Sequence, residues 1–330
     1  MTSRSRIYRA RLRAGLESVA PAAWAACPTS ALEKVETPAG SRSIRRMNGA
    51  LERVGVIGAG TMGHGIAHVC ALAGMDVILY DVTLERADAG RTKIEQNLQV
   101  GVTKGKITSD AKAAALGRVR TSATLADVQR CQMVIEAVPE TMELKKTLMR
   151  SLSELCAADA IFATNTSSLS VTEIAAAASH PERVIGLHFF NPVHLMKLLE
   201  IVRAKQTSDG TLEVARAFGA RIGKESVTVN DAPGFASTRL GIAIGLEAIR
   251  MVEQGVAAPA DIDRAMELGY GFPMGPLKLS DLVGLDVRLS IARSLHQALG
   301  SEAFKPPQLL EKMVQEGKLG RKTNEGFYRY

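Results

Sequence analysis

The sequence predicts an α/β protein whose mostly parallel sheet is followed by a smaller, all-helical region. Short apolar runs, typical of buried strands, alternate with helix-like stretches between residues 53 and 187. A glycine-rich segment joins the first apolar run to the first helix-like stretch. Beyond residue 231 only helical periodicity remains. Alternating strands and helices are typical of parallel sheets with right-handed crossovers, so this order of elements predicts the fold class.

Length and charge set the domain organisation. The chain has 330 residues, of which 46% are hydrophobic, enough for a full core and two domains. Its net charge is +7, but residues 1–46 alone carry nine Arg or Lys and three Glu. The remainder is nearly neutral, which removes the argument for nucleic-acid binding. We expect a non-core extension over 1–46, a sheet domain over 47–230 and a helical domain over 231–330.

The extension admits three interpretations. It is rich in Arg, Ser and Ala and poor in acidic residues, like an organellar transit peptide. Met47 directly precedes the first strand and would serve as a natural start, so an over-extended start is preferred over a transit peptide or a functional arm. We expect a cytoplasmic protein, or a mitochondrial-matrix protein if residues 1–46 are a transit peptide.

The cysteines indicate a reducing compartment. Cys27, Cys70, Cys131 and Cys156 show no C-x-x-C pattern and no metal-ligand spacing with histidine, so no metal site is expected. Cys70 and Cys131 lie in apolar runs, which is typical of buried structural thiols. No stretch approaches 18 consecutive apolar residues, so we expect no membrane partner.

A glycine-rich loop follows the first strand, predicted over residues 53–57. The loop reads Gly58, Ala59, Gly60, Thr61, Met62, Gly63, and a helix-like stretch follows it. A second strand over 76–80 ends at Asp81, 18 residues after Gly63. Strand, glycine loop, helix and a delayed acidic residue together are the pattern of a Rossmann-type dinucleotide site.

Each residue of this pattern has a chemical reason. Gly58 permits the tight turn, Gly60 lets the backbone approach a pyrophosphate, and Gly63 lets the helix pack closely. The helix N-terminus offers free N–H groups to the phosphates. Asp81 would accept hydrogen bonds from the adenosine ribose and repel a 2′-phosphate, which predicts NAD rather than NADP as cofactor. The alternative is a glycine-rich turn that binds no ligand.

The remaining elements continue the alternation. We expect strands over 132–138, 160–163, 183–187 and 197–202, and helices through 143–148, 242–252, 261–268, 282–295 and 309–314. Glu140, Ser167 and His188 each follow a predicted strand end. Ligands of parallel sheets bind beyond the carboxyl ends of the strands, so these three residues should line one cleft.

His188 and Glu200 form a candidate base and its orienting carboxylate. The Asn191-Pro192 pair between them is a turn signal, and a reversal near residue 194 places both residues six positions from the turn. A carboxylate beside an imidazole fixes its tautomer and stabilises its charged form. The alternative is a buried histidine bonded to backbone.

Together these stretches resemble the 3-hydroxyacyl-CoA dehydrogenase family, especially its short bacterial 3-hydroxybutyryl-CoA members, over about residues 51–330. The resemblance rests on the glycine loop and on segments 136–140, 165–169, 186–192, 231–235, 273–276 and 320–328. It implies reversible, NAD-dependent oxidation of a (3S)-3-hydroxyacyl-CoA to a 3-oxoacyl-CoA, with short chains such as 3-hydroxybutyryl-CoA. It also implies a homodimer built through the helical domain.

The resemblance assigns roles to individual residues. His188 would be the general base, Glu200 its orienter, and Ser167 a hydrogen-bond partner of the substrate oxygen. The residues matching NAD contacts of relatives, apart from the glycine loop and Asp81, are Glu140, Lys145, Ser167, Asn191 and Lys322. Asn97 and Lys104 fall where relatives hold coenzyme A, and a cation such as Lys104 or Lys106 suits a phosphate. The alternative interpretation of these residues is that they lie at a solvated helix end and bind no ligand.

One position departs from the family pattern. Relatives commonly carry Asn just before Arg239, where its amide contacts the substrate carbonyl, whereas this chain has Thr238. A hydroxyl still donates one hydrogen bond, from a shorter side chain. Either Thr238 substitutes, through a water if needed, or Ser237 shares the task; Thr238 could also bond only its own backbone.

Two rival functions remain open. One is a sister dehydrogenase acting on 3-hydroxyadipyl-CoA or on a free hydroxy acid such as gulonate. The other is a non-catalytic, NAD-binding structural protein that kept the fold.

Overall fold

The computed structural model describes residues 51–330. The predictions for residues 1–46, Cys27 and Met47 lie outside the described residues. Across the described range, no helix is both long and apolar enough to cross a bilayer.

Eight strands form one sheet in the order β3-β2-β1-β4-β5-β6-β7-β8. The strands are β1 (Arg53–Ile57), β2 (Asp76–Tyr80), β3 (Val119–Ser122), β4 (Met133–Glu136), β5 (Ile161–Thr164), β6 (Val184–Phe189), β7 (Leu198–Arg203) and β8 (Glu225–Asn230). Neighbouring strands are parallel except β6 and β7, which run antiparallel. The expected mostly parallel sheet is therefore confirmed.

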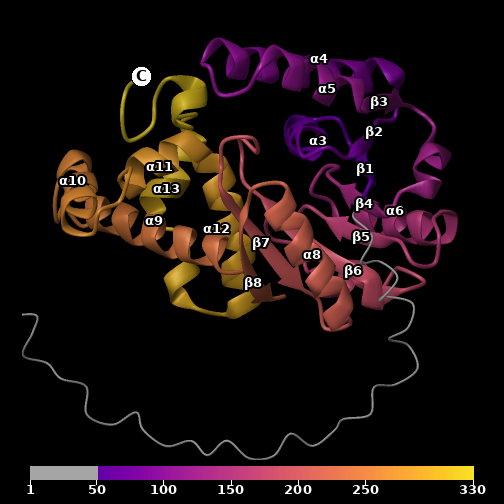
Figure 1. The fold of residues 1–330 in the computed structure, drawn as a ribbon. Coiled ribbons are helices and arrows are strands. Elements are labelled where there is room, and N and C mark those ends of the chain that lie inside the picture. Colours follow the sequence, from indigo (N-terminus) through magenta and orange to yellow (C-terminus); the bar gives the residue numbers. More distant parts are fainter. Residues whose placement is uncertain (1–50) are drawn as a thin grey trace, which may run out of the picture. The chain divides into compact units, whose positions relative to one another are not determined.

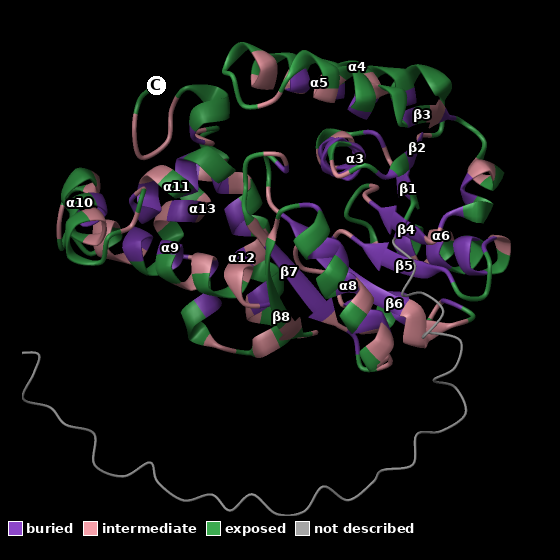
Figure 2. Cartoon of the chain, viewed as in Figure 1, coloured by how far each residue is buried: buried purple, intermediate pink, exposed green. Residues whose placement is uncertain are grey.

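Helices cover both faces of this sheet, and each face has its own apolar core. The helices up to β8 are α3 (Thr61–Leu72), α4 (Leu84–Thr103), α5 (Ser109–Gly117), η2 (Leu125–Arg130), α6 (Met142–Leu155), α7 (Val171–Ala175), η3 (Pro181–Arg183) and α8 (Asp209–Arg221). Within β5, Ile161 and Ala163 join the core under α3 and α8, whereas Phe162 joins the core under α6 and α7. Burial on both faces explains why the central strands read as continuous apolar runs (Figure 2).

A third core lies among the C-terminal helices, which gather beside β7 and β8 (Figure 1). They are α9 (Ser237–Glu253), α10 (Pro259–Gly269), α11 (Pro276–Val283), α12 (Leu285–Leu299), η4 (Glu302–Phe304), α13 (Gln308–Gln315) and η5 (Arg321–Thr323). The prediction of one helix over 282–295 is wrong. Gly284, with φ +103°, ends α11 and starts α12, in a conformation that other residues rarely adopt.

Two further details differ from the sequence prediction. His188 does not follow its strand but lies inside β6, because the ladder with β7 continues to the pair Phe189 and Leu199. Strands β3 and β8 are absent from the prediction, since their sequences, VRTS and ESVTVN, carry polar residues in place of an apolar run.

Candidate active site

The glycine loop has the geometry that its residue types predict. Gly58 has φ +95°, and a Cβ there would lie 2.8 Å from the Ala137 carbonyl oxygen. A Cβ on Gly63 would come within 1.6 Å of the Gly58 carbonyl oxygen, so α3 reaches the loop only because residue 63 has no side chain. By contrast, a Cβ on Gly60 would meet no atom within 4 Å. Exposed Gly60 caps α3, and the open space beside it suits the approach of a phosphate.

Asp81 is fixed against this loop. Its Oδ2 accepts a hydrogen bond from the Ala59 backbone N–H at 2.8 Å, and its Oδ1 accepts one from Val82 at 2.8 Å. The side chain stays partly exposed, with lone pairs left for hydroxyl donors. The remaining loop residues, Thr61 and Met62, form the exposed and half-buried first turn of α3. These features fit a dinucleotide bound at the N-terminus of α3.

His188 and Glu200 are direct partners across the antiparallel ladder of β6 and β7. The His188 Nδ1 lies 2.7 Å from the Glu200 Oε2, which assigns the ring proton to Nδ1 and leaves the Nε2 lone pair to accept another. His188 is 7% exposed and Glu200 is fully buried. The rings of Phe190 and Phe235 lie 4.5 and 5.8 Å from the imidazole centroid. The predicted pairing of imidazole and carboxylate is present in an apolar setting.

The start of α9 also binds Glu200. The Ser237 hydroxyl donates to Oε2 at 2.5 Å, and the backbone N–H groups of Ser237 and Ala236 donate to Oε1 at 2.8 and 3.2 Å. Burial by itself raises the pKa of Glu200, but the hydrogen bonds from His188 and Ser237 outweigh it, and the pKa is lowered. Ser237 thus turns its hydroxyl to Glu200, while half-buried Thr238 lies next to it in the first turn of α9.

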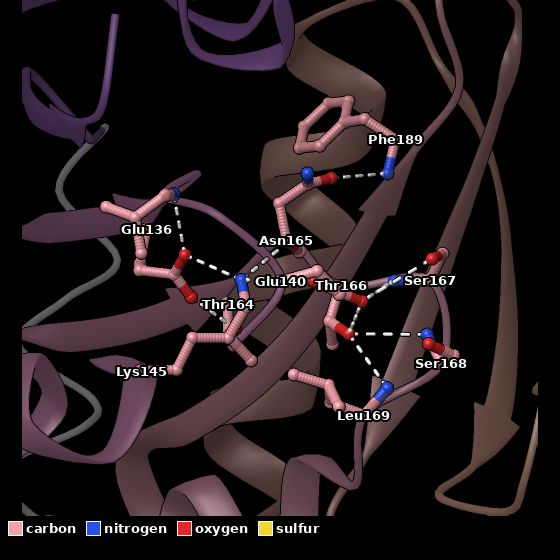
Figure 3. A network of polar contacts seen from close by, with 11 residues as sticks. Glu136, Glu140, Lys145, Thr164, Asn165, Thr166, Ser167, Ser168, Leu169 and Phe189 are labelled. Carbon is pink, nitrogen blue, oxygen red and sulfur yellow. Dashed lines mark hydrogen bonds and ion pairs between the residues drawn. The ribbon is translucent and has the colours of Figure 1, made fainter. Parts of the chain in front are cut away.

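Glu140 organises the segment after β5 that carries Ser167 (Figure 3). Its Oε1 accepts hydrogen bonds from the Thr166 hydroxyl at 2.5 Å, the Ser167 backbone N–H at 3.0 Å and the Ser167 hydroxyl at 3.4 Å. The Asn165 Oδ1 accepts from the Phe189 backbone N–H at 3.1 Å, which ties this segment to the strand of His188. The predicted residues Glu140 and Ser167 are therefore in direct contact.

Beside this segment lies a buried ion pair (Figure 3). Lys145 Nζ lies 2.7 Å from Glu136, 3.4 Å from Glu140 and 3.1 Å from the Asn165 carbonyl oxygen. Glu136 also accepts from the Thr164 hydroxyl at 2.6 Å. Burial raises the pKa of Glu136, and Lys145 and the hydrogen bonds offset that only in part.

This arrangement changes how Lys145 is interpreted. The resemblance placed it on NAD, but its side chain is 0% exposed and its ammonium is bound by protein oxygens. Sequence reasoning did not single out its partner Glu136. The available signal was a charged residue inside an otherwise apolar strand, MVIE.

The turn between the two strands of the pair rests on α3. A Cβ on Gly65 would lie 2.9 Å from the Val193 side chain, so the turn packs directly on the helix backbone. One helical turn on, the rings of His68 and His194 stack with centroids 5.1 Å apart. The helix that begins at the glycine loop therefore also supports the hairpin of β6 and β7.

The other predicted residues lie away from these contacts. Asn191 is exposed at the start of the turn, and Lys322 pairs with Asp286 at 2.5 Å. Asn97 is half-buried within α4, and exposed Lys104 caps its C-terminus, a position compatible with both interpretations given above. Among residues 51–330, no cluster of His, Cys, Asp or Glu is suited to hold a metal ion.

Comparisons with known proteins cover nearly the whole described chain. Residues 53–232 match the model of the 3-hydroxyacyl-CoA dehydrogenase NAD binding domain, and residues 234–330 match that of the 3-hydroxyacyl-CoA dehydrogenase C-terminal domain. A probable 3-hydroxybutyryl-CoA dehydrogenase of Deinococcus radiodurans is 45% identical over 278 residues, covering 84% of this chain and 100% of that protein. A 3-hydroxybutyryl-CoA dehydrogenase of Bradyrhizobium diazoefficiens is 45% identical, covering 86% and 97%.

A solved structure agrees in fold as well as in sequence. The (S)-3-hydroxybutyryl-CoA dehydrogenase of Ralstonia eutropha superposes with a TM-score of 0.83 at 38% identity. The alignment covers 85% of this chain and 99% of that one.

Proposed function

Because the chain belongs to the 3-hydroxyacyl-CoA dehydrogenase family, we propose that it oxidises short (3S)-3-hydroxyacyl-CoA substrates, such as 3-hydroxybutyryl-CoA, to 3-oxoacyl-CoA, reversibly and with NAD. The observation that carries the mechanism is the buried hydrogen bond between His188 and Glu200. It uses Nδ1 of the imidazole and leaves Nε2 of His188 to accept a proton. A carboxylate in this position stabilises the imidazolium and orients the ring. The pair therefore has the chemistry of a general base.

The residues around the glycine loop suit NAD. Free N–H groups at the start of α3 would bind its phosphates, and Asp81 would bind the adenosine ribose. When bound, NAD supplies the acceptor for the hydride that leaves C3 of the substrate. We place Asn191 and Lys322 along the same cofactor. We infer that Lys145 acts on the cofactor site indirectly, by holding Glu140.

In the oxidative direction, His188 Nε2 takes the proton of the substrate 3-hydroxyl. Ser167 is held to Glu140 by its backbone N–H, and its hydroxyl would turn from the long 3.4 Å contact with Glu140 to donate to the same substrate oxygen and fix its position. In the reductive direction this oxygen gains negative charge, so donors to it matter most there. Thr238 is the proposed second donor, because the neighbouring Ser237 hydroxyl is occupied by Glu200.

The test of this mechanism is His188→Gln, assayed by NADH-linked rates with acetoacetyl-CoA and a longer 3-oxoacyl-CoA. Loss of the base should cost about 10²–10⁴ in rate. His180→Gln, at a half-exposed histidine paired with Glu182, is the matched control and should keep full activity. Unchanged turnover in His188→Gln would refute the mechanism.

Activity on a free hydroxy acid without activity on acyl-CoA would refute the substrate class, and preference for 3-hydroxyadipyl-CoA would correct the chain length.

We propose residues 231–330 as a separate helical domain that closes the substrate cleft and forms a homodimer. The proposal is supported by exposed apolar side chains on two packed helices, Leu240 and Ile244 on α9 and Leu279 and Leu282 on α11. Leu240→Glu should convert the dimer to a monomer in light scattering. A monomeric wild type would contradict the proposal.

Asn97 and Lys104 remain the proposed coenzyme A contacts. Lys104→Ala should raise KM for acyl-CoA with kcat unchanged, since it would remove binding that is equal in ground and transition states. A solvated helix end would show no change in KM.

A reducing compartment such as the cytoplasm suits the described cysteines. Cys70, Cys131 and Cys156 are all free and buried. Burial raises the pKa of the Cys70 and Cys131 thiols to about 12 and that of Cys156 to about 11, which keeps them unreactive.

A further inference from the structure

The Glu200 carboxylate is shared between the imidazole and the first turn of α9. Its Oε2 accepts from both His188 Nδ1 at 2.7 Å and the Ser237 hydroxyl at 2.5 Å. Its Oε1 accepts from the backbone N–H groups of Ala236 and Ser237. The backbone groups bind the far oxygen, so Ser237 is the one described side chain that competes with His188 for the near oxygen.

We propose that Ser237 is a positioning residue for the reaction, whose hydroxyl locks the Glu200 carboxylate and moderates its attraction for the His188 proton. The inference rests on the proposed role of His188 as base. Ser237 acts through Glu200, because its hydroxyl hydrogen is donated to that carboxylate.

The physical argument is one of shared charge. Two donors on one carboxylate oxygen each receive less of its negative charge than a single donor would. The positive end of the α9 dipole, close to Oε1, draws on the same charge. Without the Ser237 hydroxyl, Oε2 would bind the imidazolium more strongly, so His188 would keep its proton to higher pH.

The surroundings contain no other group to take over this task. On β8 the residue paired with Glu200 is Val227, on β6 it is His188, and the rings next to the imidazole are Phe190 and Phe235. In the described structure His188 is also the one titratable group that acts electrostatically on Glu200. A change at Ser237 should therefore alter the proton affinity of His188 directly.

The Ser237 hydroxyl also fixes the orientation of the Glu200 carboxylate, in addition to sharing its charge. The hydroxyl and the N–H of Ser237 bind different oxygens of the same carboxylate, which fixes its rotation about the terminal bond. A carboxylate held by backbone alone keeps one oxygen free to turn away from the imidazole. Misorientation of a base lowers kcat while substrate affinity is retained.

The experiment compares Ser237→Ala with Ser237→Thr, which keeps the hydroxyl, by measuring kcat and KM of hydroxyacyl-CoA oxidation against pH. Ser237→Ala should move the acid limb of the kcat profile up by about half a pH unit. Above that limb kcat should fall about three- to tenfold, with KM for both substrates unchanged. Ser237→Thr should restore the wild-type profile. If Ser237→Ala does not fold, Ser237→Gly removes the same hydroxyl.

A second readout does not depend on activity. In protein labelled with ¹⁵N-histidine, the NMR titration midpoint of His188 should rise in Ser237→Ala and return in Ser237→Thr. An unmoved acid limb together with an unmoved NMR midpoint would overturn the role of Ser237, and loss of stability alone would mark a structural role. Should His188→Gln retain turnover, the proposed base fails, while the NMR titration still decides whether Ser237 acts on the pair.

Discussion

Two buried carboxylates of the same sheet, Glu136 on β4 and Glu200 on β7, differ in the direction of their pKa shifts. Both are 0% exposed, and each lies 2.7 Å from a side-chain nitrogen. Burial raises the pKa of both, yet for Glu200 the hydrogen bonds reverse the effect and for Glu136 they do not. The helix N-terminus at Ser237 supplies the additional donors.

The partner of a buried carboxylate determines what that carboxylate can do. Glu136 faces Lys145, whose ammonium also holds Glu140 and the Asn165 carbonyl, so this pair supports the segment that carries Ser167. Glu200 faces an imidazole, which can take up and release a proton near neutral pH. The Glu136–Lys145 pair therefore supports the surrounding backbone, whereas the Glu200–His188 pair has the proposed role of general base.

Breaking the Glu136–Lys145 pair should have the greatest effect, and that effect is on stability. Lys145→Met leaves Glu136 buried without its cation, which should lower the free energy of unfolding by about 3–5 kcal/mol. Urea denaturation followed by circular dichroism measures the change.

The double variant Lys145→Met/Glu136→Gln is its control. The introduced glutamine would carry no charge, would accept from the Val138 N–H through its carbonyl oxygen and would donate to the Thr164 hydroxyl through its amide, so the double variant should regain most of the lost stability. A double variant as unstable as the single one would mean that Lys145 acts through packing instead of charge.

At the His188–Glu200 pair the expected effect is on rate. Glu200→Gln removes the charge that stabilises the imidazolium while keeping a similar shape, and kcat should fall about a hundredfold. Steady-state assays of NADH formation measure this fall. An exposed carboxylate on the same sheet gives the control: Glu225→Gln on β8 should leave kcat unchanged. A fall in stability as large as that of Lys145→Met would remove the distinction between the two pairs.

The smallest effect is in the pH dependence of stability, and its sign differs between the two sites. The Glu200 pKa lies below its usual 4.5, so its contribution is present above pH 4.5 and is lost as the pH falls further. The Glu136 pKa lies above 4.5, so its contribution decreases as the pH rises beyond 4.5.

The difference in the free energy of unfolding between the wild type and the Gln variant, measured by thermal or urea unfolding between about pH 3.5 and 7, should therefore rise with pH for Glu200. For Glu136 the same difference should fall with pH. Slopes of the same sign would contradict the comparison, whatever the constant offset between the variants.

Much of the site could be predicted because it depends on local order along the chain. The glycine loop and Asp81 belong to one strand–helix–strand unit, and the facing of His188 and Glu200 follows from a single turn between two strands. Such contacts need only the spacing of residues and the periodicity of strands.

The rest depends on contacts that local periodicity does not indicate. Ser237 reaches Glu200, 37 residues away, only because α9 begins against β7. Glu136 and Lys145 are only nine residues apart, but no pattern in this segment indicates that the lysine is buried against that carboxylate. The break at Gly284 escapes prediction for a related reason: the apolar periodicity of 282–295 continues across it, and only the tertiary packing selects the positive φ.

The contact between Gly65 and Val193 constrains the order in which this protein can change. An added methyl group at residue 65 would collide with the Val193 side chain, only 2.9 Å from the new carbon. A lineage could therefore accept alanine at position 65 only after a smaller residue had replaced Val193. Position 65 lies on the helix that follows the glycine loop and position 193 on the turn between β6 and β7, so substitutions in these two segments would depend on one another.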